Sequence, residues 1–150
     1  MRALALAALA LLAGQSSAQT LPAAARGYLG TWTIVDETTN EAKAVVQITQ
    51  AGAGVEGRIV RLLPTREFPT VSYACASCQG TYHNADLRRV LLIRGMTWDG
   101  SRFSGGRIVD PQANKEYRAT MTLDGPARLR VRGYIGIPTF GRTQVWTRAR

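Results

Sequence analysis

The chain has 150 residues, of which 45% are hydrophobic, and a formal net charge of +9. This length is typical of one domain and excludes two domains of ordinary size. A positive charge balance favours anionic partners such as acidic lipid head groups or lipopolysaccharide, although solubility alone is a sufficient explanation. We expect one small basic domain with a single hydrophobic core.

The first 18 residues have the three parts of a secretory signal peptide. Arg2 supplies the positive charge, residues 3–14 form a short apolar run, and the small residues Ser16 and Ala18 stand where a signal peptidase cleaves. The apolar run is shorter than the roughly 20 residues that a membrane-spanning helix needs, and no later run approaches that length. We predict cleavage between Ala18 and Gln19, which leaves a single domain of residues 19–150 in the periplasm or outside the cell.

After a stretch that we expect to be flexible, residues 19–26, short β-rich runs alternate with turn residues. This pattern is typical of an all-β domain. In the second run, Ala44, Val46 and Ile48 fall on one face and Val45, Gln47 and Thr49 on the other, so one face should be buried. The predicted strands are residues 29–35, 42–49, 54–63, 90–96, 102–109, 116–123, 128–135 and 143–148.

Turn residues at 98–101, 110–114 and 124–126 predict hairpins, so consecutive strands should pair as antiparallel neighbours. A meander of eight strands leaves two exposed edges unless the first and last strands meet. We therefore predict a small closed up-and-down β-barrel with one long loop, residues 64–89, between its third and fourth strands. A loop of that length is usually functional or held by a covalent link.

Cys75 and Cys78 lie in this loop and are the only cysteines of the chain. In an oxidising compartment we expect them to form a disulfide. The alternative is a metal site in which Cys75, Cys78 and His83 bind zinc, with Asp86 as a fourth ligand. No Gly-x-Ser-x-Gly elbow or Asp–His pair accompanies His83, so we expect neither enzymatic activity nor a cofactor.

Six short motifs are spread over nearly the whole predicted mature chain. They are KAVV (residues 43–46), GRIV (57–60), SGGRIVDP (104–111), KEY (115–117), VRGYIG (131–136) and GRTQVWTR (141–148). In this order they resemble the bacterial domain of unknown function (DUF) family 2147, and residues 65–88 resemble its variant with a Cys pair in the loop. The resemblance implies an exported β protein but no chemistry, since the family has no established activity.

The triplet Gly30-Thr31-Trp32 opens the first predicted strand and is similar to the Gly-x-Trp signature of lipocalins. In that family the Trp packs beneath the barrel and a late Arg lies across it. The resemblance implies a lipocalin-like barrel in which Trp32 is structural and Arg148, or Arg142, covers its ring. A cation over an indole face contributes about 0.5–2 kcal/mol, depending on burial.

Arg128, Arg130 and Arg132 alternate with Leu129 and Val131 in the seventh predicted strand, so the three arginines project from one face. Two interpretations of this stripe stay open, a docking surface for phosphate or acidic lipid and a solvated outer face. Under the first interpretation, the three arginines are our candidate ligand-binding residues.

For the whole domain we expect a binding module whose barrel holds a small apolar or amphiphilic ligand, with arginines near the rim at its anionic end. The alternatives are an envelope-interaction protein with a filled barrel and a basic outer face, and a metal- or redox-active protein built on the cysteine loop. We expect a monomer with no nucleic-acid partner. An eight-strand barrel is either filled by side chains or holds one small ligand, so strand count alone does not decide.

Overall fold

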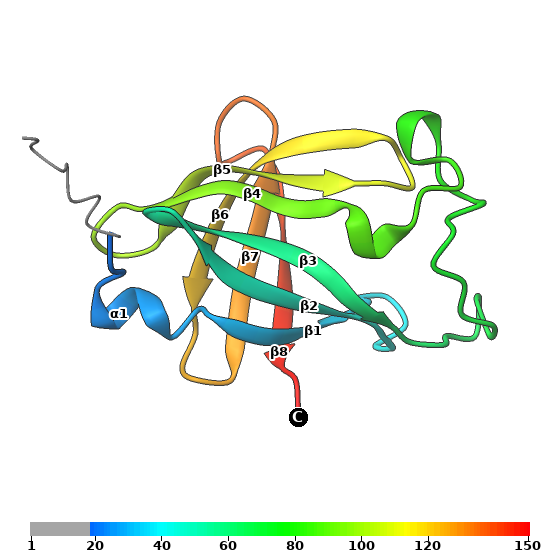
Figure 1. The fold of residues 1–150 in the computed structure, drawn as a ribbon, viewed down its shortest axis with the longest axis horizontal. Coiled ribbons are helices and arrows are strands. Elements are labelled where there is room, and N and C mark those ends of the chain that lie inside the picture. The colour runs from blue at the N-terminus through cyan, green and yellow to red at the C-terminus, as the bar shows by residue number, and fades with distance from the viewer. Residues whose placement is uncertain (1–18) are drawn as a thin grey trace, which may run out of the picture.

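The structure is a computed structural model that describes residues 19–150; the predicted signal peptide, residues 1–18, lies outside the described residues. In the described part, eight strands form one closed antiparallel barrel in which each strand pairs with the next and β8 returns to β1 (Figure 1). The predicted up-and-down barrel is therefore confirmed. The strands are β1 (Gly30–Val35), β2 (Ala42–Ala51), β3 (Gly54–Leu62), β4 (Leu91–Trp98), β5 (Phe103–Asp110), β6 (Lys115–Leu123), β7 (Arg128–Tyr134) and β8 (Gly141–Arg148).

The alternation in the strand sequences produces one buried and one wet face. On β2, Ala44, Val46 and Ile48 are buried while Gln47 and Thr49 are exposed. Val45, which we expected on the wet face, is also buried, and it lies where the pairing of β2 with β3 shifts register. These buried faces meet in a single core inside the barrel. Within residues 19–150, we find no helix with the length and apolar character needed to cross a membrane.

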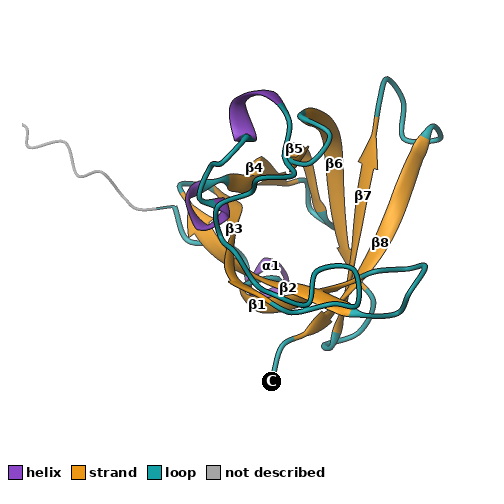
Figure 2. Ribbon diagram, turned by 90° about the vertical axis from the view of Figure 1, so that its right-hand side faces the viewer, coloured by secondary structure: helices purple, strands orange, loops and turns teal. Residues whose placement is uncertain are grey.

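A short helix, α1 (Ala23–Arg26), lies across one end of the barrel (Figure 2). We expected this stretch to be flexible, and the structure corrects that expectation: Ala25 is fully buried and Leu21 nearly so. The four-residue segment is too short for its own sequence to predict a helix. Its order comes from packing against the barrel end, which sequence periodicity does not report.

Tyr28 follows α1 in the chain and belongs to an aromatic cluster at the same end of the barrel. Its ring centroid lies 5.0 Å from that of Phe103 and 5.8 Å from that of Trp98, both in edge-to-face geometry. The Tyr28 hydroxyl accepts a hydrogen bond from the Leu123 N–H (3.1 Å). The Trp32 indole N–H donates to the Tyr28 carbonyl oxygen (2.9 Å). These contacts fill and close the end of the barrel that α1 covers.

Arg148 covers Trp32 from the last strand. Its guanidinium carbon lies 3.9 Å from the Trp32 ring centroid, and its N–H groups donate to the carbonyl oxygens of Leu29 (2.8 Å) and Gly27 (2.7 Å). Gly30 has a φ of +115°, and a Cβ there would lie 3.0 Å from Arg148 Nη1. The Gly-Thr-Trp triplet is therefore explained by backbone conformation and by the position of Arg148. Arg142 lies elsewhere, at the other end of the barrel.

Candidate ligand-binding cavity

The barrel is hollow at the end opposite α1, where a cavity of about 1170 Å³ lies between four loops. Loops that follow odd-numbered strands share one end of an up-and-down barrel, and here they are residues 36–41, 63–90, 111–114 and 135–140. Figure 2 shows these loops around the near end and α1 at the far end. The deep wall of the cavity is apolar and consists of Ile34, Ala44, Ile59, Leu92, Val131 and Trp146.

Side-chain size explains why only one half of the barrel is hollow. Trp32, Phe103 and Met121 are fully buried in the core, and none of them lines the cavity. The open half has Ala44 and Gly133 on its inner wall, where larger side chains would close the space. Strand count allows both a filled and a hollow barrel, and this chain is filled at one end and hollow at the other.

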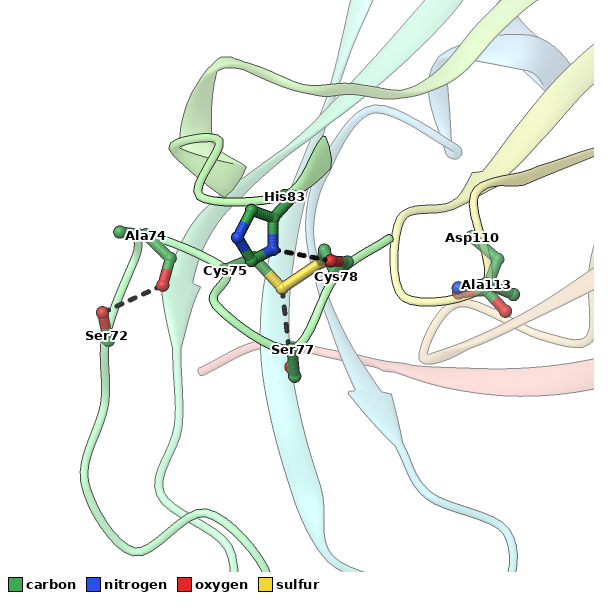
Figure 3. The surroundings of a disulfide bond; sticks show 8 residues. All are labelled: Ser72, Ala74, Cys75, Ser77, Cys78, His83, Asp110 and Ala113. Carbon is green, nitrogen blue, oxygen red and sulfur yellow. Dashed lines mark hydrogen bonds between the residues drawn. A yellow bond between two sulfur atoms is a disulfide. The ribbon is translucent and has the colours of Figure 1, made fainter. Parts of the chain in front are cut away.

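Figure 3 shows the disulfide between Cys75 and Cys78. Both cysteines are among the residues of the long loop that line the cavity. Both cysteines are buried, and they are held by backbone hydrogen bonds from Cys75 N to Ala85 O (3.1 Å) and from Asn84 N to Cys75 O (2.9 Å). The loop also contains the 3₁₀ turns η1 (Gly80–Tyr82) and η2 (Leu87–Arg89). The long loop is therefore ordered by hydrogen bonds and by a disulfide at the edge of the cavity, and the predicted disulfide is present.

The same geometry removes the thiolates that the alternative zinc site needs. The two sulfur atoms are bonded to each other. The His83 ring nitrogen Nδ1 lies 3.2 Å from the Cys78 carbonyl oxygen, in hydrogen-bond contact (Figure 3). Among residues 19–150, no three His, Cys, Asp or Glu side chains are grouped to hold a metal ion. Zinc binding at this loop would require the disulfide to be reduced first.

Acidic residues outnumber basic ones at the cavity. In the part of the chain that the structure describes, the cavity is lined by the acids Asp36, Glu37, Glu41, Glu67 and Asp110 and by the bases Lys43, Arg66 and Arg142. Three pairs join them across 2.8 to 3.4 Å: Glu37 with Arg142, Glu41 with Arg66 and Asp36 with Lys43. A protein of net charge +9 thus has a mouth with an excess of carboxylates.

Backbone hydrogen bonds define the state of one of these acids. The N–H groups of Thr39 and Thr38 donate to Asp36 Oδ1 at 3.0 and 2.9 Å, and Lys43 adds an ion pair. These donors favour the ionised carboxylate and lower the pKa of Asp36 to about 2. Asp36 is therefore a fixed negative charge at the rim of the cavity.

The arginine stripe lies on the outer wall. Arg128 and Arg130 are exposed, Leu129 and Val131 between them are buried, and none of Arg128, Arg130 and Arg132 lines the cavity. Arg132 donates to the carbonyl oxygens of Pro138 (2.7 Å) and Thr139 (3.3 Å), so it holds the β7–β8 loop. The structure brings the three arginines together on one face but places them outside the lumen.

Two further sequence expectations concern the cavity. The seventh predicted strand, residues 128–135, includes Ile135, but β7 ends at Tyr134 and Ile135 is exposed in the following loop. The acids of the 36–41 turn were not predicted as site residues. Their position after an odd-numbered strand is the signal that places them beside the long loop.

Comparison with solved structures finds a similar barrel in protein HP1028 from the human pathogen Helicobacter pylori, which belongs to the lipocalin family. The TM-score is 0.65 at 11% sequence identity, and the match covers 81% of this chain and 82% of that one, so the likeness shows the fold. No curated protein matches the chain. A family model for "Uncharacterized protein conserved in bacteria (DUF2147)" matches residues 30–148. In agreement with the sequence motifs, the chain therefore belongs to the DUF2147 family.

Proposed function

We propose that this protein is an exported, non-enzymatic binding protein that holds a small apolar or amphiphilic ligand in the open half of its barrel. The observation that carries the proposal is the cavity of about 1170 Å³, which is apolar in depth and polar at its mouth. Barrels of eight strands can hold one small ligand in this way, as lipocalins do. An apolar tail in the lumen would gain about 0.8 kcal/mol for each buried methylene group.

The charges at the mouth favour a neutral or cationic polar end on that ligand. Five carboxylates and three cations line the cavity, and one of the carboxylates, Asp36, is ionised down to a pH of about 2. An anionic head group would be repelled by this excess, whereas a neutral or cationic one would not. The arginines that we expected to meet an anionic end lie on the outer wall. We therefore propose a neutral or cationic head group in place of the anionic one.

Displacement of a neutral fluorescent naphthylamine dye from the mature protein tests this proposal. The competitors are a fatty amine, a monoacylglycerol and a fatty acid that share one tail length. We expect saturable binding, with the amine and the glycerol ester displacing the dye at least threefold better than the fatty acid. The absence of saturable binding for all three up to millimolar concentrations would remove the binding function.

A pair of variants on β2 shows whether the probe occupies the lumen. Ala44→Phe places a ring into the cavity, whereas Gln47→Phe adds the same ring to the outer face of the same strand. We expect Ala44→Phe to weaken binding tenfold or more and Gln47→Phe to leave it unchanged. Equal binding by the two variants would place the probe outside the barrel.

The export part of the proposal is supported by the signal-peptide pattern of residues 1–18. Intact-mass measurement of the protein from the periplasm or culture medium tests it. We expect a chain that begins at Gln19. A cell-associated protein that retains residues 1–18 would contradict the proposed cleavage.

A further inference from the structure

Exposed apolar side chains are concentrated at the mouth of the barrel. Among residues 19–150, six large hydrophobic side chains are strongly exposed, and five of them belong to two mouth loops: Phe68, Val71, Ile135, Ile137 and Phe140. The sixth, Val60, lies on β3 and is 41% exposed. Single exposed apolar residues are normal on a protein surface, but a group around one opening indicates an interaction surface.

The β7–β8 loop presents its apolar residues outward in a hydrogen-bonded conformation. Phe140 N donates to Ile137 O (3.1 Å) and Ile135 N to Phe140 O (3.3 Å), while Arg132 holds the loop from β7. Phe140 is 73% exposed and Ile137 is 55% exposed. Ile137 does not line the cavity, so a ligand in the lumen does not cover it. This loop therefore presents apolar surface to something outside the barrel.

An arginine lies two residues along the chain from the phenylalanine of each loop, Arg66 in the long loop itself and Arg142 at the start of β8. Arg66 precedes Phe68 and Arg142 follows Phe140, and these arginine side chains are 88% and 71% exposed. They pair with Glu41 and Glu37, so the charges beside the apolar residues are partly balanced. An aromatic ring beside an exposed cation is the combination that suits the boundary between lipid head groups and acyl chains.

The net charge of the molecule also favours binding to a lipid surface, provided that the surface is anionic. Its net charge is +9, or +8 for residues 19–150, since Arg2 is lost. Lys43, Arg66 and Arg142 pair with three of the five carboxylates at the mouth, so the local excess of negative charge is small. The net charge of the whole molecule therefore decides the attraction to an anionic bilayer surface, and this attraction weakens as salt screens it. A bilayer at the mouth would also bring its lipids to the opening of the apolar cavity.

We propose that the open end of the barrel docks on an anionic lipid bilayer, with the exposed side chains of its two mouth loops entering the interface. This inference goes beyond ligand binding. Four of the five exposed loop residues also line the cavity, but Ile137 does not, so Ile137 belongs to the docking surface alone. Salt should reduce docking without abolishing it, since the apolar contacts remain when the charges are screened.

Cosedimentation of the mature protein with phosphatidylcholine vesicles, with and without 30% phosphatidylglycerol, tests docking at about 50 and 300 mM salt. We expect binding to the anionic vesicles at both salt concentrations, weaker at the higher one. The double variant Ile137→Ser/Phe140→Ser should lose tenfold or more of this binding. The control Val60→Ser also removes an exposed apolar side chain, but away from the mouth, and should bind like the unmodified protein.

Three results would overturn the docking proposal. The first is the absence of binding to any of the vesicles, and the second is an equal loss in the Val60 control and the double variant. The third is a concentration-dependent dimer that the double variant abolishes, which would make a second copy of the chain the occupant of this surface. The single variant Ile137→Ser separates the two proposals, because it should weaken vesicle binding while dye binding in the lumen is unchanged.

Discussion

The two ends of this barrel use the same eight strands for different purposes. At the α1 end, Tyr28, Trp32 and Phe103 are buried, and Tyr28 contacts both of the others. Arg148 donates hydrogen bonds that tie the last strand to the N-terminal segment. At the loop end, aromatic side chains such as Phe140 are exposed, and the inner wall contains alanine and glycine.

This difference indicates that the α1 end contributes most to the stability of the barrel and that the loop end is available for binding. Close packing and hydrogen-bonded carbonyls at one end stabilise the whole barrel, because closure of a sheet depends on the meeting of its first and last strands. An open cavity has fewer favourable contacts, so its walls can be changed at a lower cost in stability. Matched substitutions at the two ends should therefore have unequal effects on stability.

The largest expected contrast comes from one change, Phe to Ala, at each end. Phe103→Ala leaves a cavity beside Tyr28 and Trp98 and should lower the free energy of unfolding by about 3–5 kcal/mol. Phe140→Ala removes an exposed ring and should change it by less than about 0.5 kcal/mol. Urea unfolding followed by tryptophan fluorescence measures both. Similar losses would mean that the loop end also stabilises the barrel.

A second contrast uses Arg to Met at each end. Arg148→Met removes the cation from the Trp32 ring and the donors to the Gly27 and Leu29 carbonyls, which should cost about 1.5–3 kcal/mol. Arg142→Met breaks one exposed pair with Glu37 and should cost about 0–1 kcal/mol. The same urea experiment applies. If the Arg142 variant is the less stable one, the Glu37–Arg142 pair holds the β1–β8 seam closed.

Replacement of the disulfide should have an intermediate effect on stability and a local effect on structure. Cys75→Ser/Cys78→Ser opens a very short covalent loop, which should cost about 2 kcal/mol or less. The loss of stability should be confined to the long loop, so limited proteolysis should cut residues 63–90 faster while the barrel remains intact. Cleavage spread over the whole chain would show that the disulfide stabilises the barrel as well as the long loop.

Much of the fold is predictable from sequence, because alternating strands and turn residues act locally. All eight predicted strands are present, with their ends shifted by at most two residues, and Asp99-Gly100 and Asp124-Gly125 mark two of the hairpins. The helix α1 was missed because its order depends on contacts with the barrel end. Local sequence patterns do not contain those contacts.

The candidate site was less predictable, because it depends on which side chains from distant strands meet. The alternation of Arg130 with Leu129 and Val131 was visible, but it did not show which face enclosed the lumen. The buried positions of Leu129 and Val131 now assign that face. Whether the lumen is filled depends on side-chain sizes such as those of Phe103 and Ala44 at different heights in the barrel.

The smallest expected effect concerns acid and again differs between the ends. The pKa is lowered to about 2 for two carboxyl groups, that of Asp36 at the mouth and that of Asp99 in the β4–β5 turn at the closed end. The main cause is hydrogen bonding by backbone N–H groups. Those of Thr39 and Thr38 donate to Asp36, and those of Ser101 and Arg102 donate to Asp99. The folded-state pKa of each carboxyl group is below its ordinary value of 3.8, so each negative charge stabilises the fold above about pH 4. This contribution is lost as the pH falls toward 2.

The two carboxylates should nevertheless affect different properties of the protein. The Asp99 turn connects Trp98 to Phe103 in the aromatic cluster, so its protonation should lower the melting temperature of the whole barrel. Asp36 holds the β1–β2 turn at the rim, so its protonation should mainly weaken dye binding. Melting curves and dye titrations between pH 5 and 2 should therefore show a flatter melting profile for Asp99→Asn and a flatter binding profile for Asp36→Asn. The reverse pattern would place the acid-sensitive part of the fold at the mouth, where close packing is absent.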